Sequence, residues 1–165
     1  MKLIPEYVNK LCEEIIYTAK ITKKLGLKLD TVYFGGGTPT TLTAAQLDRV
    51  MKVIENSFDM STVREYTVEA GRPDTITEEK LNVLKANGCG RVSINPQTLN
   101  DSVLEAIGRK HTTAQFFDSF DLARKVGFDS INTDIIAGLP TDTVESFENT
   151  LSLIHISEPT RPERI

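Results

Sequence analysis

Cysteines and long apolar runs are both scarce in this chain of 165 residues. Its two cysteines, Cys12 and Cys89, lie far apart, so the sequence indicates neither a disulfide framework nor a metal-spaced pair, and we expect two buried thiols. No apolar run approaches the roughly 20 residues that a membrane helix needs. The N-terminus, "MKLIPEYVNK", lacks the apolar centre of a signal peptide. These absences predict a cytoplasmic protein without a membrane segment.

An excess of positive charge is also missing. The chain has 19 Lys and Arg residues against 23 Asp and Glu residues, a formal net charge of -4 at pH 7. A basic surface is the usual electrostatic mark of nucleic-acid binding, so we expect no nucleic-acid partner. The length suits one domain with a real core and is too short for two ordinary ones.

Helical and strand patterns alternate along the chain. Apolar residues at spacings of three and four predict a helix over residues 6–25, and Thr43 and Thr77 are typical N-caps of two later helices. The predicted strands, with "TVYF" read as a short buried one, are "TVYF", residues 66–69, "RVSI" and the start of "INTDIIAGLP". A repeat of about 30 residues is typical of βαβ units, so we predict an α/β fold with a parallel sheet.

Ligands of such sheets bind at the carboxyl ends of the strands. This rule selects the glycines after the first strand, Glu69, Gln97 and Asp134. We read Asp134 as lying within an otherwise apolar strand, where an unpaired carboxylate is costly, and therefore expect a partner or a ligand for it. His111 is expected at the surface, at a helix start. The phenylalanines at 116, 117 and 120 are expected to pack in the core.

The stretch "TVYFGGGTPT" carries three consecutive glycines. It fails the dinucleotide pattern G-x-G-x-x-G, because the sixth position counted from Gly35 is Thr40, and it has no lysine for a P-loop. A sharp turn between strand and helix is one explanation, but a single glycine usually suffices for that. Three glycines followed by Thr-Pro suggest a ligand lying against exposed backbone groups.

"GGGTPT" after a strand resembles the radical S-adenosylmethionine (SAM) enzymes of the oxygen-independent coproporphyrinogen III oxidase type. Further similar motifs follow in family order: "TVEAGRPDTIT", "RVSINPQTLND", "LEAIGRKHT" and "INTDIIAGLPTDTVESF". The motifs "VEAGRPD" and "INPQT" are most similar to those of the coproporphyrinogen dehydrogenase branch of this family. The resemblance runs from about residue 5 to residue 150. It implies part of a radical SAM (β/α) barrel, similar to a TIM barrel, with about four parallel βα units.

The resemblance also implies roles for individual residues. Gly36, Gly37 and Thr38 would hold the amino-acid end of SAM through backbone groups. Glu69 would accept hydrogen bonds from the SAM ammonium group, a charge-assisted contact. The family pattern implies contacts to SAM for three further residues: Gln97, Arg109 and Asp134.

The activity that the resemblance implies is the oxidative decarboxylation of two coproporphyrinogen III propionates to vinyl groups in haem biosynthesis. Its cofactors are SAM and a 4Fe-4S cluster, and its partners are a porphyrinogen substrate and an electron donor. Two other functions stay open: a haem chaperone of the same superfamily, and a SAM-dependent radical enzyme with another substrate.

The family's cluster motif, C-x-x-x-C-x-x-C, does not occur in this sequence. In the family it precedes the helix placed here at residues 6–25, so we expect residues 1–150 to be part of a radical SAM core domain that is inactive by itself. From about residue 151, "LSLIHISEPTRPERI" resembles a translated sequencing adapter. We therefore expect residues 151–165 to be a non-native tail; the alternative is a native helix, because "VESFENTLSLIHI" is amphipathic.

Overall fold

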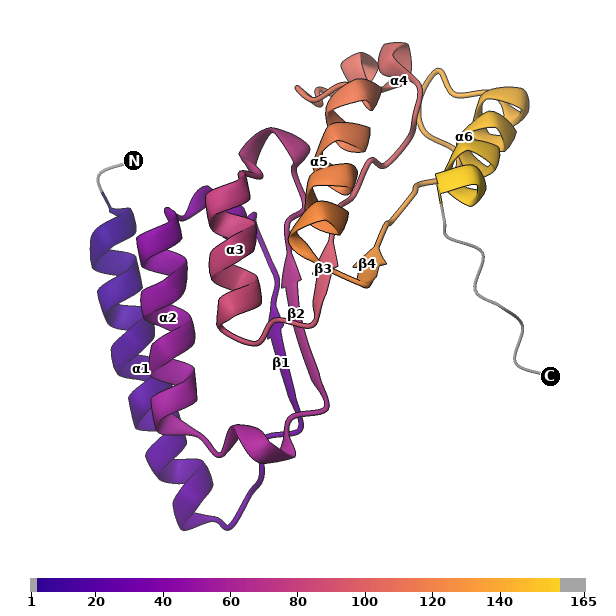
Figure 1. The fold of residues 1–165 in the computed structure, drawn as a ribbon. Coiled ribbons are helices and arrows are strands. Elements are labelled where there is room, and N and C mark those ends of the chain that lie inside the picture. The colour runs from indigo at the N-terminus through magenta and orange to yellow at the C-terminus, as the bar shows by residue number, and fades with distance from the viewer. Residues whose placement is uncertain (1–2, 158–165) are drawn as a thin grey trace, which may run out of the picture.

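The computed structural model describes residues 3–157 as a four-stranded parallel sheet with the order β1-β2-β3-β4, covered by helices (Figure 1). The strands are β1 (Thr31–Phe34), β2 (Glu65–Glu69), β3 (Arg91–Ser93) and β4 (Ser130–Asn132). The helices are α1 (Ile4–Lys24), α2 (Ala44–Ser57), α3 (Glu78–Ala86), α4 (Asp101–Ala106), α5 (Thr113–Val126) and α6 (Val144–Ser157). Three short 3-10 turns complete the list: η1 (Pro39–Thr41), η2 (Met60–Thr62) and η3 (Pro73–Thr75). The α/β class and the parallel sheet are confirmed.

Side-chain hydrogen bonds cap the N-termini of α2 and α3 at the residues that the sequence predicts. The Thr43 hydroxyl accepts from the amide of Gln46, whose side chain accepts from the Thr43 amide, so the expected capping box begins α2. Thr77 caps α3 in the expected way. Figure 1 shows α1, α2, α3 and α5 side by side in chain order along the sheet. The helices between successive strands, α2, α3 and α5, form the crossovers of successive βα units, whereas α1 precedes β1.

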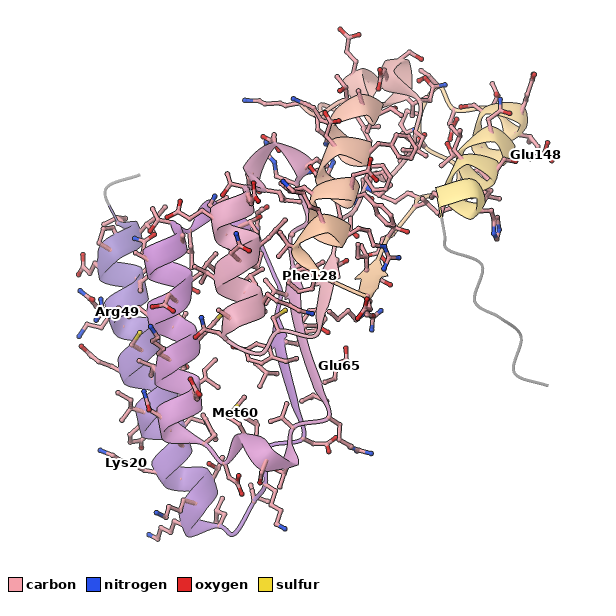
Figure 2. The ribbon with its side chains drawn as sticks, in the orientation of Figure 1. Lys20, Arg49, Met60, Glu65, Phe128 and Glu148 are labelled. Atoms are coloured by element: carbon pink, nitrogen blue, oxygen red, sulfur yellow. The ribbon has the colours of Figure 1, made fainter. Side chains whose placement is uncertain are left out.

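The two faces of the sheet differ in character. Val32, Val68 and Val92 pack into the apolar core beneath the helices, whereas the alternate positions of the same strands are polar. Glu65 projects from β2 on the side away from the helices (Figure 2). The interpretation of "TVYF" as a short buried strand is therefore wrong for one of its two faces: Val32 is buried, but Tyr33 is 58% exposed on the polar face.

Other expectations about the core have mixed outcomes. Phe116 and Phe120 are buried with rings in contact, and Phe117 packs at their side, as predicted. Both cysteines are buried, also as predicted. The expectation of a surface His111 is wrong, since its side chain is only 3% exposed. Its ring lies beneath the loop that follows β3, a tertiary contact with no local sequence signal.

The last described helix, α6, runs through residues 151–157, and residues 158–165 lie outside the described part of the chain. The Thr150 hydroxyl, which is buried, accepts from the amide of Leu99 at 3.2 Å and so ties α6 to the segment before α4. A helical conformation is compatible with either origin of this stretch, so the non-native tail stays a prediction. Within residues 3–157, no helix combines the length and the apolar character that crossing a membrane requires.

Candidate functional site

The residues selected from the sequence gather at one end of the sheet. The glycine turn follows β1, Glu69 is the last residue of β2, Gln97 lies four residues beyond β3, and Asp134 lies two residues beyond β4. Because all four strands are parallel, these positions share the carboxyl edge of the sheet. That edge is where ligands of α/β proteins bind.

The three glycines of the turn differ in what requires them. A Cβ on Gly35 would lie 2.7 Å from Cε1 of Tyr33 and 3.5 Å from Oε1 of Glu69, so the Tyr33 ring in its present position leaves no room for a side chain there. Gly36 has φ +101°, a conformation that side chains other than glycine rarely adopt. Gly37 has neither a positive φ nor any neighbouring atom within 4 Å of an added Cβ. Its open backbone has space for a ligand.

A short hydrogen bond joins β1 to β2 beside this turn. The Tyr33 hydroxyl donates to Oε1 of Glu69 at 2.6 Å, a length typical of a charge-assisted bond. Donation to the carboxylate stabilises the protonated phenol, so the pKa of Tyr33 is raised above its ordinary value. The bond holds the Glu69 carboxylate next to Gly35.

Beyond the strand ends, backbone pairing brings Gln97 and Asp134 together. The Gln97 amide donates to the Asp134 carbonyl at 3.2 Å, and the Ile136 amide donates to the Gln97 carbonyl at 2.8 Å. Gln97 is 9% exposed and has φ 68°, which is unusual for a residue that is not glycine. The placement of Asp134 within an apolar strand is wrong, because β4 ends at Asn132 and Asp134 is exposed. Its expected partner is the Asn132 side-chain amide, which donates to Oδ1 at 2.9 Å.

A polar network that the sequence reading missed connects these groups across the sheet. Asn95 Oδ1 accepts from the Ser93 hydroxyl at 2.8 Å and from the main-chain amide of Asp134 at 3.1 Å. The side-chain amide of Asn132 donates to Ser93 Oγ at 3.2 Å, and the Arg91 guanidinium donates to Asn132 Oδ1 at 2.9 Å. Polar residues at every second strand position were the available signal, because a period of two places them on one face.

Arg109 is the least connected of the predicted residues. It follows α4, is partly buried, and forms no ion pair with a carboxylate within residues 3–157. Two residues later, Nε2 of His111 lies 3.2 Å from the carbonyl oxygen of Pro96. Burial lowers the pKa of His111. The neutral ring donates to Pro96 and so supports the loop that presents Gln97.

Behind the glycine turn, a lysine ties two 3-10 turns together. The Lys80 ammonium donates to the carbonyl oxygens of Thr40 at 2.6 Å and Thr75 at 2.9 Å, and the two threonine hydroxyls lie 2.6 Å apart. Desolvation lowers the pKa of Lys80. These bonds hold the turn after β1 against the turn after β2.

The site suits SAM better than it suits an iron-sulfur cluster. Gly37 leaves backbone open, and Glu69 offers a carboxylate beside it for a ligand ammonium group. A 4Fe-4S cluster needs several thiolates, whereas Cys12 and Cys89 are the only two cysteines. Cys89 is enclosed in the core, where burial raises the pKa of its thiol to about 11. The donors in this sequence therefore do not fit a cluster, and its ligands would have to come from elsewhere.

Comparison with known proteins gives relatives along most of the chain. It is 48% identical over 131 residues to the oxygen-independent coproporphyrinogen-III oxidase-like protein HemZ of Bacillus subtilis, covering 79% of this chain and 26% of that protein. Identity to the heme chaperone HemW of the same organism is 40% over 153 residues, covering 90% and 39%. The chain thus spans about a quarter to two fifths of the length of these relatives.

The fold has a solved counterpart. The structure of coproporphyrinogen III oxidase (HemN) from Escherichia coli, described as a radical SAM enzyme, superposes with a TM-score of 0.82 at 33% identity, covering 94% of this chain and 35% of that one. This match identifies the four βα units as part of a TIM-barrel-like radical SAM fold. The family model described as the radical SAM superfamily matches residues 2–154. The chain belongs to the radical SAM superfamily.

Proposed function

We propose that this chain supplies the SAM-binding part of a coproporphyrinogen dehydrogenase that acts in the cytoplasm. The observation that carries the proposal is the 48% identity to the coproporphyrinogen-III oxidase-like protein of Bacillus subtilis. The 34% identity over 156 residues to the oxygen-independent coproporphyrinogen III oxidase of Escherichia coli supports the same reaction.

The carboxyl edge of the sheet would bind SAM. Gly36, Gly37 and Thr38 would hold its amino-acid end through backbone groups, and Glu69 would accept hydrogen bonds from its ammonium group. The Glu69 carboxylate beside the open backbone of Gly37 supports this assignment. Further contacts to SAM would come from the residues at the other strand ends and after α4: Gln97, Arg109 and Asp134.

When bound, SAM and a 4Fe-4S cluster would supply the radical chemistry that removes a hydrogen atom from a substrate propionate. Loss of carbon dioxide and of one further electron to an acceptor would leave a vinyl group. Two such reactions convert coproporphyrinogen III to protoporphyrinogen IX. An electron donor is required to start each cycle. The residues of this chain bind and orient, and the cluster ligands come from outside this sequence.

A haem chaperone is the second candidate function, favoured by the 40% identity to the heme chaperone HemW of Bacillus subtilis. A third is a SAM-dependent radical enzyme with another substrate, because porphyrin recognition cannot be assigned to any residue among 3–157 on physical grounds.

The test of this proposal is an activity assay on a protein that contains this chain together with the cysteines that bind the cluster. That protein would be expressed, purified and reconstituted anaerobically with iron and sulfide. The product would be supplied with SAM, a reductant and coproporphyrinogen III, and porphyrins would be separated by chromatography. Formation of protoporphyrinogen IX is expected. Stable haem binding without decarboxylation would favour the chaperone. SAM cleavage with neither outcome would indicate another substrate.

A further inference from the structure

The contact between Tyr33 and Glu69 is not forced by packing. Tyr33 lies on β1, at the edge of the described sheet, and its side chain is 58% exposed. An exposed tyrosine ordinarily directs its hydroxyl to water, yet this one bonds a carboxylate on the neighbouring strand at 2.6 Å. The bond spans two positions that both point away from the helices, at the carboxyl end of the sheet.

The ring and the turn are fitted to each other. Cε1 of Tyr33 would be 2.7 Å from a Cβ on Gly35, and Cδ1 would be 3.0 Å from it, so the ring can lie here only because residue 35 is glycine. The three residues therefore depend on one another. Gly35 leaves space for the Tyr33 ring, and the ring hydroxyl orients the Glu69 carboxylate.

The arrangement leaves half of the Glu69 carboxylate available. Oε1 accepts from Tyr33, while Oε2 has no hydrogen-bond partner among residues 3–157. A carboxylate with one oxygen fixed and one open is suited to an ammonium group, because its orientation is set before the ligand arrives. A tyrosine hydroxyl is protonated near neutral pH even at its ordinary pKa, and the carboxylate raises the pKa of Tyr33 further, so the hydroxyl remains a donor.

We propose that Tyr33 is a positioning residue, whose hydroxyl holds the Glu69 carboxylate beside the glycine turn so that its other oxygen receives the amino group of SAM. The inference rests on the proposed binding of SAM and is independent of the proposed porphyrinogen substrate. It assigns Tyr33 no part in the radical chemistry.

The test compares two ligands by equilibrium dialysis on the full chain. SAM carries the amino group, whereas 5′-methylthioadenosine keeps the nucleoside and the sulfur but has no amino-acid end. Tyr33→Phe preserves the ring against Gly35 and is expected to weaken SAM binding about 3- to 10-fold, the range for losing one typical net hydrogen bond, because the hydroxyl is exposed and acts on SAM only through the carboxylate. Affinity for 5′-methylthioadenosine is expected to stay unchanged.

Two controls separate positioning from general damage. Tyr17→Phe removes a hydroxyl from an exposed tyrosine of α1, which is 66% exposed, and should change neither affinity. In a Glu69→Gln background, adding Tyr33→Phe should cost little more, because the hydroxyl acts through the carboxylate. Equal weakening of both ligands by Tyr33→Phe, or unchanged SAM binding, would overturn the proposal.

A second measurement needs no ligand. Titration of tyrosine labelled with carbon-13 at Cζ, followed by NMR, should show the Tyr33 pKa falling when Glu69 is replaced by Gln. An unchanged Tyr33 titration would mean that the contact is absent in solution, and the proposal would fail. A wild-type chain that binds neither ligand would count against both this inference and SAM binding. Absence of decarboxylation, with the Tyr33 effect intact, would refute only the porphyrinogen substrate.

Discussion

The main-chain amide of Gln97 donates to the carbonyl oxygen of Asp134, across the gap between the segments that follow β3 and β4. The pairing continues the sheet beyond its regular strands and places two predicted SAM ligands next to each other. It depends on Gln97 holding φ 68°, so the backbone at this position carries a cost that neighbouring contacts offset.

Substitutions at Gln97 should therefore separate backbone from side-chain effects. Gln97→Val should lower the free energy of unfolding by about 1–2 kcal/mol, since a β-branched residue is poorly tolerated at positive φ. Gln97→Gly relieves that strain and should leave stability unchanged or raised, while removing the side chain proposed to contact SAM. Urea-induced unfolding and SAM dialysis would measure both effects. A valine variant as stable as wild type would contradict the strained backbone.

Alanine substitutions in the glycine turn should have different consequences at adjacent positions. Gly36→Ala should destabilise the chain by about 1–2 kcal/mol, because residue 36 has φ +101°. In Gly37→Ala the added Cβ has no neighbouring atom within 4 Å, so the free energy of unfolding should change by no more than about 0.5 kcal/mol. If the methionyl end of SAM lies against this backbone, Gly37→Ala should nevertheless weaken SAM binding at least about tenfold. Unchanged affinity would remove Gly37 from the site.

Acid should destabilise the chain through His111. Because the folded-state pKa is lowered from 6.5, the unfolded chain binds a proton first, and the free energy of unfolding should decrease as pH falls below about 6.5. The charged groups that influence the ring are Arg109, Asp74 and Arg72. His111→Gln should flatten the dependence between pH 5 and 7.5 in urea titrations. His155→Gln, at an exposed position of α6, is the matched control and should behave as wild type. A pH dependence that survives His111→Gln would refute this assignment.

Loss of the Lys80 ammonium should loosen the turn behind the candidate site. Lys80→Met keeps most of the side-chain volume but leaves the carbonyls of Thr40 and Thr75 without this donor, at an expected cost of about 1–3 kcal/mol. Lys52→Met removes only a surface pair with Asp48 and should cost about 0–1 kcal/mol. SAM affinity should fall for the Lys80 variant alone. Equal free energies of unfolding for the two variants would show that the Lys80 hydrogen bonds do not stabilise the packing of the two turns.

Local patterns predicted much of this fold because their causes are local. The capping box of Thr43 and Gln46 needs only residues three apart, and the helical stripes follow from apolar spacing. Strand order was also accessible, since successive βα units favour neighbouring parallel strands. The strand faces were misread: Tyr33 follows the apolar Val32, and a four-residue run does not reveal whether its second face is covered.

The sequence by itself determined the α/β alternation, the helix starts, the glycine turn and the candidates at the strand ends, because each depends on short-range spacing. Only the tertiary structure decided which of these residues meet. Burial of His111 beneath Pro96, the bond from Tyr33 to Glu69 and the pairing of Gln97 with Asp134 join segments 15 to 37 positions apart. Such contacts depend on how the strands lie next to one another, and no local propensity specifies them.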